Sequence, residues 1–314
     1  MQAYIEEKTR ELENQVFAQT KKADFADFWA DAVAQLRKKE LVVKKEKLDL
    51  PYEKCFTTYE ITFNTLDDTW IHAYFSCPKH KEGEKLPCVA YFHGGSGYKR
   101  VYHDILATGV CCFAIDVRSQ GGTSVDMATY TSGDRMGGLM SRGVLDKNEF
   151  YMKNIYLDAV RAMDVIASLE EVDPSRIVTY GVSQGGALSI VASALSGRAK
   201  KCYPVVTSYC CLKQRTENGT GVFEATHAFL RVYPEHTDTV METLSYFDII
   251  NMVSLLKTPV CFCLALADKI CLPPYVYSAY HHANCEKSIK MYPFTPHDIP
   301  RDYMLFAHKE FSEL

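Results

Sequence analysis

The sequence lacks several features that would indicate a metal-binding, nucleotide-binding or membrane protein. It has 12 cysteines but no Cys-x-x-Cys pair, so a zinc ribbon or a thioredoxin-type redox pair has no support. Neither Gly-x-Gly-x-x-Gly nor the P-loop spacing occurs, and no apolar run reaches the length of a membrane span. With a formal net charge of −4, nothing favours nucleic acid or an anionic membrane as a partner.

What the sequence does contain is typical of a globular enzyme. Its 314 residues are 47% hydrophobic and 24% charged, enough for a large core, and we expect a single α/β domain over residues 1–314 with insertions. The cysteines fall largely inside apolar runs such as 110–113 and 260–263, which indicates buried, reduced thiols. Residues 1–20 are charged and amphipathic without the apolar stretch of a signal peptide, so we expect a cytoplasmic location.

Strand and helix patterns alternate along the chain. Residues 1–40 predict two helices, and apolar spacing predicts another over 151–168. The strand-like runs are 41–43, 55–63, 70–75, 87–92, 111–116, 177–180, 259–266 and 289–292. Such alternation predicts an α/β-hydrolase type of architecture, with a mostly parallel central sheet covered by helices on both faces. Two less regular stretches, 121–150 and 207–252, are expected to be excursions that shape a pocket or an interface.

Residues 181–185 read Gly-Val-Ser-Gln-Gly and provide a candidate nucleophile, Ser183. The motif lies between a β-prone run, 177–180, and a helix-prone run, 187–194, which is the context of a nucleophile elbow. A serine hydroxyl is a weak nucleophile until a sharp turn exposes it to a base and nearby N–H groups can hold the developing negative charge. Small residues suit that turn because strand and helix approach closely.

Two residues downstream have the right types and order to assist Ser183. Asp268 ends the apolar run 260–267, where a carboxylate that orients a histidine is expected, although a solvated turn aspartate is the alternative. His297 follows the strand-like run 289–292 and would act as the general base. His308 is a competing histidine in helix-like surroundings, and His281 and His282 favour a helix face over a metal site.

An acyl-transfer site also needs donors for an oxyanion. Residues 93–97 read His-Gly-Gly-Ser-Gly after an early strand, so the N–H of Gly95 is one candidate donor and that of Gln184, directly after the nucleophile, is the other. The alternative is a glycine-rich turn without catalytic function. This chemistry needs no metal and no organic cofactor, and we expect none.

Six ordered segments carry a resemblance to a known family. They are 116–121 (Asp-Val-Arg-Ser-Gln-Gly), 141–146 (Ser-Arg-Gly-Val-Leu-Asp), 158–162 (Asp-Ala-Val-Arg-Ala), 181–186 (Gly-Val-Ser-Gln-Gly-Gly), 243–248 (Thr-Leu-Ser-Tyr-Phe-Asp) and 268–274 (Asp-Lys-Ile-Cys-Leu-Pro-Pro). With these segments the chain, from about residue 5 onward, resembles the acetyl xylan esterase and cephalosporin C deacetylase family, carbohydrate esterase family 7, of the α/β-hydrolase superfamily.

The resemblance implies a serine esterase that removes acetyl groups from small acetylated sugars, such as acetylated xylo-oligosaccharides, and from cephalosporin C. It also implies a homo-hexamer, a trimer of dimers that encloses its active sites. By position, Ser183 is the nucleophile, Asp268 the acid and His297 the base. Gly95 and Gln184 are the implied oxyanion donors.

Three positions depart from the family pattern. The Arg-Gly-Gln signature is Arg118-Ser119-Gln120 here, and the Glu that follows the catalytic histidine is Asp298. The resemblance implies that Arg118, Gln120 and Asp298 form a polar network that supports the site, although Asp298 is one methylene shorter than Glu. The third departure is Gly95, where tyrosine is common in the family, and we hypothesise a broader acyl pocket from the loss of that ring.

Two other functions remain open from the sequence. One is an esterase or peptidase of different specificity on the same fold, for example of the prolyl-oligopeptidase kind, although those enzymes usually carry a large additional domain. The other is a non-catalytic binding protein that keeps the fold. The altered signature residues favour this second alternative, whereas the intact order of Ser183, Asp268 and His297 speaks against it.

Overall fold

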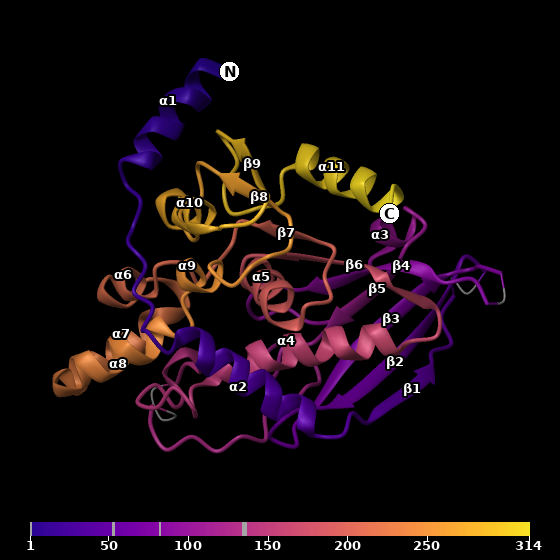
Figure 1. Ribbon diagram of the computed structural model, residues 1–314, viewed down its shortest axis with the longest axis horizontal. Helices are drawn as coiled ribbons and strands as arrows, with labels where there is room; N and C mark the ends of the chain where they lie inside the picture. The colour runs from indigo at the N-terminus through magenta and orange to yellow at the C-terminus, as the bar shows by residue number, and fades with distance from the viewer. Residues whose placement is uncertain (1, 52–53, 82, 134–136) are drawn as a thin grey trace.

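A nine-stranded sheet runs through the computed structural model, which describes residues 2–51, 54–81, 83–133 and 137–314 (Figure 1). Its strands are β1 (Val43–Lys47), β2 (Phe56–Asn64), β3 (Trp70–Pro78), β4 (Leu86–Phe92), β5 (Cys111–Ile115), β6 (Val172–Val182), β7 (Lys201–Val205), β8 (Val260–Ala265) and β9 (Lys287–Tyr292). Their order is β1-β2-β3-β5-β4-β6-β7-β8-β9. The pairs from β5 to β9 are parallel, and the three pairs that involve β1, β2 and β3 are antiparallel. The predicted mostly parallel sheet is therefore confirmed.

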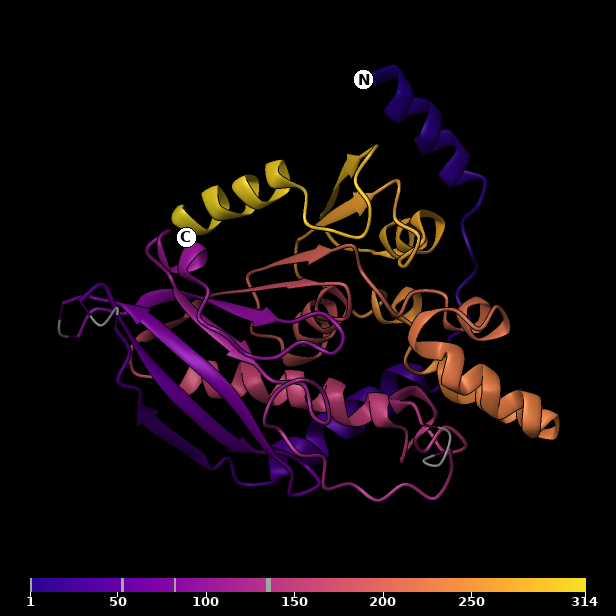
Figure 2. The same cartoon turned by 180° about the vertical axis from the view of Figure 1, so that it is seen from behind.

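Helices cover both faces of this sheet. They are α1 (Gln2–Glu13), α2 (Phe25–Lys38), α3 (His103–Leu106), α4 (Tyr151–Ser168), α5 (Gln184–Ser196), α6 (Leu212–Glu217), α7 (Glu224–Val232), α8 (Thr237–Ser245), α9 (Ile249–Met252), α10 (Pro273–His282) and α11 (Arg301–Ser312). In Figures 1 and 2, α2, α4 and α5 lie on one side of the sheet and α3 and α11 on the other. The layered arrangement follows from the need of the central parallel strands to bury both of their faces.

Alternation along β4 separates two hydrophobic cores. Ala90 and Phe92 pack with the helices on one face of the sheet, whereas Val89 and Tyr91 pack with α3 and α11 on the other. All four side chains are buried, as expected for a central parallel strand with period-two alternation of its side chains. Such a strand is fixed in place from both sides, so the loop that follows Phe92 starts from a rigid support.

The N-terminal helices are held in different ways. Phe25, Trp29 and Leu36 form the apolar stripe of α2, and the indole N–H of Trp29 donates to the carbonyl of Tyr246 at 2.9 Å. Helix α1 stands farther from the sheet, beyond β9 and α10, where the ring of Tyr4 stacks on Phe294 with 5.9 Å between centroids (Figure 1). No helix in the described part of the chain is both long and apolar enough to cross a membrane.

The two excursions differ from each other. Within the described residues, segment 121–150 consists mainly of turns and bends around the 3₁₀ turn Leu139–Ser141, and its residues 134–136 lie outside the described ranges. Segment 207–252, expected to be less regular, contains the short helices α6 to α9. The segments touch where the hydroxyl of Thr226, on α7, donates to the carbonyl of Met140. These helices are short, and short amphipathic elements with mixed polarity give weak periodicity.

Candidate active site

Ser183 occupies the sharp turn between β6 and α5. It is the residue that immediately precedes α5, and its backbone has φ 58° and ψ −116°, a conformation that side chains with a Cβ rarely adopt. Strain of this kind costs about 1–3 kcal/mol and persists only where surrounding contacts enforce it. Here the N–H of Ser183 donates to Val205 O at 2.9 Å, and its carbonyl accepts from Ser208 N at 3.0 Å. The end of β7 therefore holds the elbow.

The glycines of the motif are required by packing. A Cβ at Gly185 would lie 1.8 Å from the carbonyl oxygen of Phe92, and one at Gly181 would lie 2.4 Å from the carbonyl oxygen of Gly185. Both contacts are with backbone, which cannot move aside as a flexible side chain would. The start of α5 thus packs directly on the end of β4, and only glycine permits this approach.

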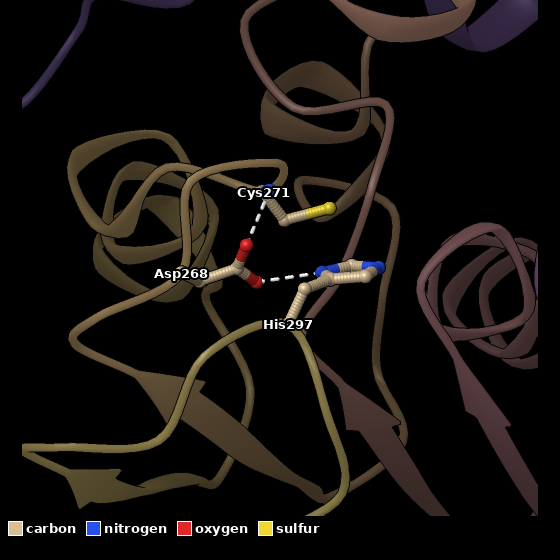
Figure 3. Close-up of side chains that lie close together, drawn as sticks. All are labelled: Asp268, Cys271 and His297. Carbon is tan, nitrogen blue, oxygen red and sulfur yellow. Dashed lines mark hydrogen bonds and ion pairs between the residues drawn. The ribbon is translucent and has the colours of Figure 1, made fainter.

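Asp268 and His297 form a hydrogen-bonded pair on the loops after β8 and β9. The Nδ1 atom of His297 lies 2.7 Å from Oδ2 of Asp268, as Figure 3 shows. The other carboxylate oxygen, Oδ1, accepts from the N–H groups of Ile270 at 2.7 Å and Cys271 at 2.9 Å. The Asp268 side chain is 1% exposed and that of His297 21% exposed, so the acid is enclosed and the imidazole reaches solvent.

This pairing changes the proton affinity of the imidazole. The hydrogen bond to Asp268 is the main reason that the pKa of His297 lies above its ordinary value, and the thiol of Cys271 raises the pKa further. Burial opposes both effects but is smaller than their sum. An arrangement that favours the imidazolium is suited to a base that must accept a proton from a nearby hydroxyl.

The elbow and the acid loop are linked through the segment that follows β7. Ser208 binds the carbonyl of Ser183, and Arg215, on α6, donates to Cys210 O and to Ile270 O, each at 3.0 Å. Since parallel strands end at the same edge of a sheet, Ser183, Asp268 and His297 all follow strands at one edge. Among the described residues, the Ser183 hydroxyl has no hydrogen bond to His297, a contact that in hydrolases often tightens only with substrate bound.

The candidate oxyanion donors lie on both sides of the elbow. Gln184 is the first residue of α5, and the N–H groups of a first turn have no acceptor within their helix. Gly95 follows Gly94, where an added Cβ would lie 3.9 Å from the Cβ of Ser183. In the described ranges the Gly95 N–H makes no hydrogen bond within the chain. Both groups are available to an acceptor beside Ser183.

Gln120 connects the two donor segments. Its Oε1 accepts from the backbone N–H of Ser96 at 2.9 Å and from Nε2 of Gln184 at 3.0 Å, while its Nε2 donates to Oε1 of Gln184 at 2.8 Å. The Tyr209 hydroxyl donates to the same Gln184 oxygen at 2.5 Å. Sequence reasoning identified Gln120 but missed Tyr209, because nothing local marks a tyrosine after β7 as part of this network.

Arg118 lies close in sequence to Gln120 and is held by carboxylates other than Asp298. Its guanidinium pairs with both oxygens of Asp158 at 2.7 Å, contacts Asp126 at 3.0 Å, and is hydrogen-bonded to Asp67. Asp298 is exposed, and its carboxylate accepts from the N–H of Ile299 at 2.7 Å. The expected placement of Asp298 in the Arg118 network is therefore wrong, because three other carboxylates already occupy the guanidinium donors.

Two other histidines considered in the sequence analysis lie away from the Asp268–His297 pair. His308, on α11, is 3.4 Å from Asp104, and the ring of His282, on α10, donates to the carbonyl of Phe17 at 2.7 Å. Over residues 2–51, 54–81, 83–133 and 137–314, one group of three potential metal ligands is found, Asp268, Cys271 and His297. The sequence analysis singled out the first and third of these residues but assigned no function to Cys271.

Comparison with known proteins identifies relatives over nearly the whole chain. In solved structures, the acetyl xylan esterase from Paenibacillus sp. R4 is 33% identical, with a TM-score of 0.90 over 97% of this chain and 98% of that one. Acetyl xylan esterase 1 from Thermoanaerobacterium sp. JW/SL YS485 is 26% identical, with a TM-score of 0.89 and the same coverage. These likenesses confirm the predicted α/β-hydrolase fold.

A curated relative and a family description agree with the structures. Acetyl esterase Axe7A of Xylanibacter ruminicola is 26% identical over 282 residues, which are 87% of this chain and 63% of that protein, so the chain spans less than two thirds of this relative. Residues 5–312 match the protein family described as "Acetyl xylan esterase (AXE1)". The elbow, the Asp268–His297 pair and these matches together place the chain in the acetyl xylan esterase family.

Proposed function

We propose that the protein is a serine esterase that removes acetyl groups from small acetylated carbohydrates, with acetylated xylo-oligosaccharides and cephalosporin C as substrates. The observation that carries the proposal is the strained Ser183 elbow at the same sheet edge as the Asp268–His297 pair. Membership of the acetyl xylan esterase family supports the ester substrate and the enzyme class.

The reaction follows from the positions of the groups. Ser183 attacks the acetyl carbonyl while His297 accepts its proton, and Asp268 fixes the tautomer and stabilises the imidazolium. The N–H groups of Gly95 and Gln184 bind the oxyanion. His297 then protonates the departing sugar alcohol, and a water molecule activated by His297 cleaves the acetyl-enzyme. No step requires a metal or an organic cofactor.

The experiment that tests this proposal is acetate release by the purified protein from acetylated xylo-oligosaccharides and from cephalosporin C. Release from either substrate supports the deacetylase, and the ratio of the two kcat/KM values defines its preference. A protein that releases no acetate from either, while it hydrolyses aminoacyl amides, would instead be a peptidase on this fold.

Assembly and location belong to the same proposal. We infer a hexamer that encloses its active sites and a cytoplasmic location, and the free state of the twelve cysteines supports a reducing compartment. The solution mass tests the assembly, and a monomer would remove the enclosed chamber. The single domain over residues 1–314 stays a prediction.

The pH dependence of kcat/KM tests the Asp268–His297 pair. Asp268 raises the pKa of His297, so the imidazole stays protonated up to a higher pH. The neutral imidazole, which is the form that can accept a proton, is present only when the pH exceeds this raised pKa. We expect an acidic limb whose midpoint lies above the ordinary histidine value of about 6.5. Asp268→Asn should move this midpoint down and lower kcat by about 10⁴-fold. A wild-type midpoint at or below the ordinary value would contradict the assignment.

The acyl preference tests the role of Gly95. A Cβ built at Gly95 meets no atom within 4 Å, so this side of the donor loop has room for a larger group. We expect kcat/KM for p-nitrophenyl acetate to exceed that for the butyrate by less than about tenfold, or about 1.4 kcal/mol. Gly95→Tyr should raise this ratio by restoring an aromatic wall. Gly95→Ala is the matched control and should leave the ratio close to that of the wild type; a wild-type ratio well above tenfold would refute the broader pocket.

A further inference from the structure

The thiol of Cys271 lies beside the Asp268–His297 pair and neither forms a bond nor transfers a proton in the reaction described above. One ligand atom from each of the three residues lies within 4.8 Å of the other two, and Figure 3 shows the Cys271 side chain extending toward the imidazole. Asp268 and Cys271 are buried, whereas His297 is partly exposed. A carboxylate, a thiol and an imidazole at this separation are the ligand types that zinc binds.

We propose that Asp268, Cys271 and His297 form an inhibitory site for Zn²⁺ and similar thiophilic divalent cations. The loss of activity on binding rests on the proposed function, but the binding itself does not. Bond lengths of about 2.0–2.3 Å place the ligand atoms of a tetrahedral zinc site about 3.4–3.6 Å apart. The 2.7 Å contact between His297 and Asp268 would open by less than about 1 Å, and the thiol, whose sulfur lies within 4.8 Å of the other two ligand atoms, would move inward by at most about 1.3 Å.

The carboxylate of Asp268 is already oriented to bind a zinc ion together with His297. The two backbone N–H groups of Ile270 and Cys271 occupy Oδ1 of Asp268, which leaves Oδ2 directed at His297. Zinc can take Oδ2, the Cys271 thiolate and Nδ1 of His297 without breaking the bonds to Oδ1. A water molecule would complete the tetrahedron, as in other zinc sites with three protein ligands. Of Asp268 and His297, it is the ring of His297 that reaches solvent.

The proton balance explains why binding would inhibit. Zinc loses coordinated water molecules, the thiol loses its proton to solvent, and the imidazole proton resides on Nε2 once Nδ1 binds the metal. If the imidazole is protonated beforehand, a second proton is released. With Nε2 protonated and Nδ1 bound to the metal, His297 has no lone pair to accept the Ser183 proton. Binding should therefore be tighter at higher pH and should abolish general base catalysis.

The experiment combines inhibition with a spectroscopic readout that does not need activity. Esterase activity is titrated with Zn²⁺ and with Mg²⁺, then a chelator is added. The same titration is made on Cys271→Ser, on Cys271→Ala and on Cys55→Ser, which removes an exposed thiol and is the matched control. For each variant, the residual activity at each metal concentration is divided by the activity of the same variant without metal, and the inhibition constant is taken from that curve. Co²⁺ is then added to the wild type, to Ser183→Ala and to Cys271→Ser, and the thiolate-to-cobalt charge-transfer band is recorded.

We expect reversible inhibition by Zn²⁺ but not by Mg²⁺, which avoids thiolates. The inhibition constant should rise about tenfold or more in both Cys271 variants and stay unchanged in Cys55→Ser. The cobalt band should appear in the wild type and in Ser183→Ala and be absent in Cys271→Ser. Equal zinc sensitivity of wild type and Cys271 variants, or no thiolate band in the wild type, overturns the proposal. A band in a protein without esterase activity would keep the metal site and reject the proposed function.

Discussion

Ser183→Ala lowers kcat for acetyl esters by about 10⁴- to 10⁶-fold if Ser183 is the nucleophile, because the acetyl-enzyme can no longer form. The fold should not change, since the methyl side chain retains the backbone hydrogen bonds of the elbow to Val205 and Ser208. Acetate release and the unfolding midpoint are measured together. A variant that keeps more than about 1% of the activity in a clean preparation shows that another residue attacks the ester.

A fluorophosphonate probe provides a control that does not depend on substrate choice. The wild type should be labelled at Ser183, as located by peptide mass, and Ser183→Ala should not be labelled. Ser189, which is buried in α5 and donates to the carbonyl of Gly185 at 2.8 Å, is a matched serine on the helix that Ser183 precedes. Labelling that survives in Ser183→Ala would identify a different activated serine, whereas an unlabelled wild type would favour the non-catalytic alternative.

Arg118→Met should cause the largest loss of stability, about 3–5 kcal/mol in the free energy of unfolding. The guanidinium is 1% exposed and neutralises Asp126 and Asp158, whose side chains are 2% and 4% exposed. Without it these carboxylates would be buried charges without a cation. Burial raises the pKa of Asp158 to about 7 although Arg118 lowers it, so without the guanidinium this pKa should lie higher still. The variant then protonates Asp158 at a higher pH than the wild type does, and the loss should shrink as the pH falls toward 7.

Denaturant unfolding of two further variants separates this effect from the loss of any arginine. Arg198→Met removes a guanidinium that is 39% exposed and pairs with Asp164, and it should cost less than about 1 kcal/mol. Adding Asp158→Asn to Arg118→Met should recover part of the loss, because one unpaired charge disappears. If Arg118→Met lowered the free energy of unfolding by no more than Arg198→Met does, the buried cluster around Arg118 would not stabilise the fold as proposed.

Most strands of the sheet could be predicted from the sequence because they are short runs rich in apolar, aromatic and β-branched residues. Strands β2 to β5, β8 and β9 begin and end within three residues of their expected ranges, and α4 matches its expected range. β1 lies later than expected, since its Lys-rich, exposed residues carry no hydrophobic signal. β7 was missed because it contains Pro204, and proline normally argues against a central strand.

The candidate site was more predictable than the loops around it. The spacing of Ser183, Asp268 and His297 relative to strand ends follows from chain order, whereas the partners of Arg118 depend on how three distant segments fold together. Ser119, a departure from the family glycine, adopts φ 56°. The turn at Ser119 thus has a left-handed backbone, with the strain that a residue with a Cβ incurs there.

The two hydrogen bonds that Gln120 accepts couple the positions of the two candidate oxyanion donors. Gly95 and Gln184 belong to segments far apart in sequence, yet one amide side chain holds both the loop beside Gly95 and the first residue of α5. The two donors therefore form one mechanical unit, and a shift of either segment is transmitted to the other. Donors fixed in advance need no reorganisation as charge develops on the carbonyl oxygen. Substitutions at Ser96, Gln120 and Tyr209 should accordingly act non-additively on the same step.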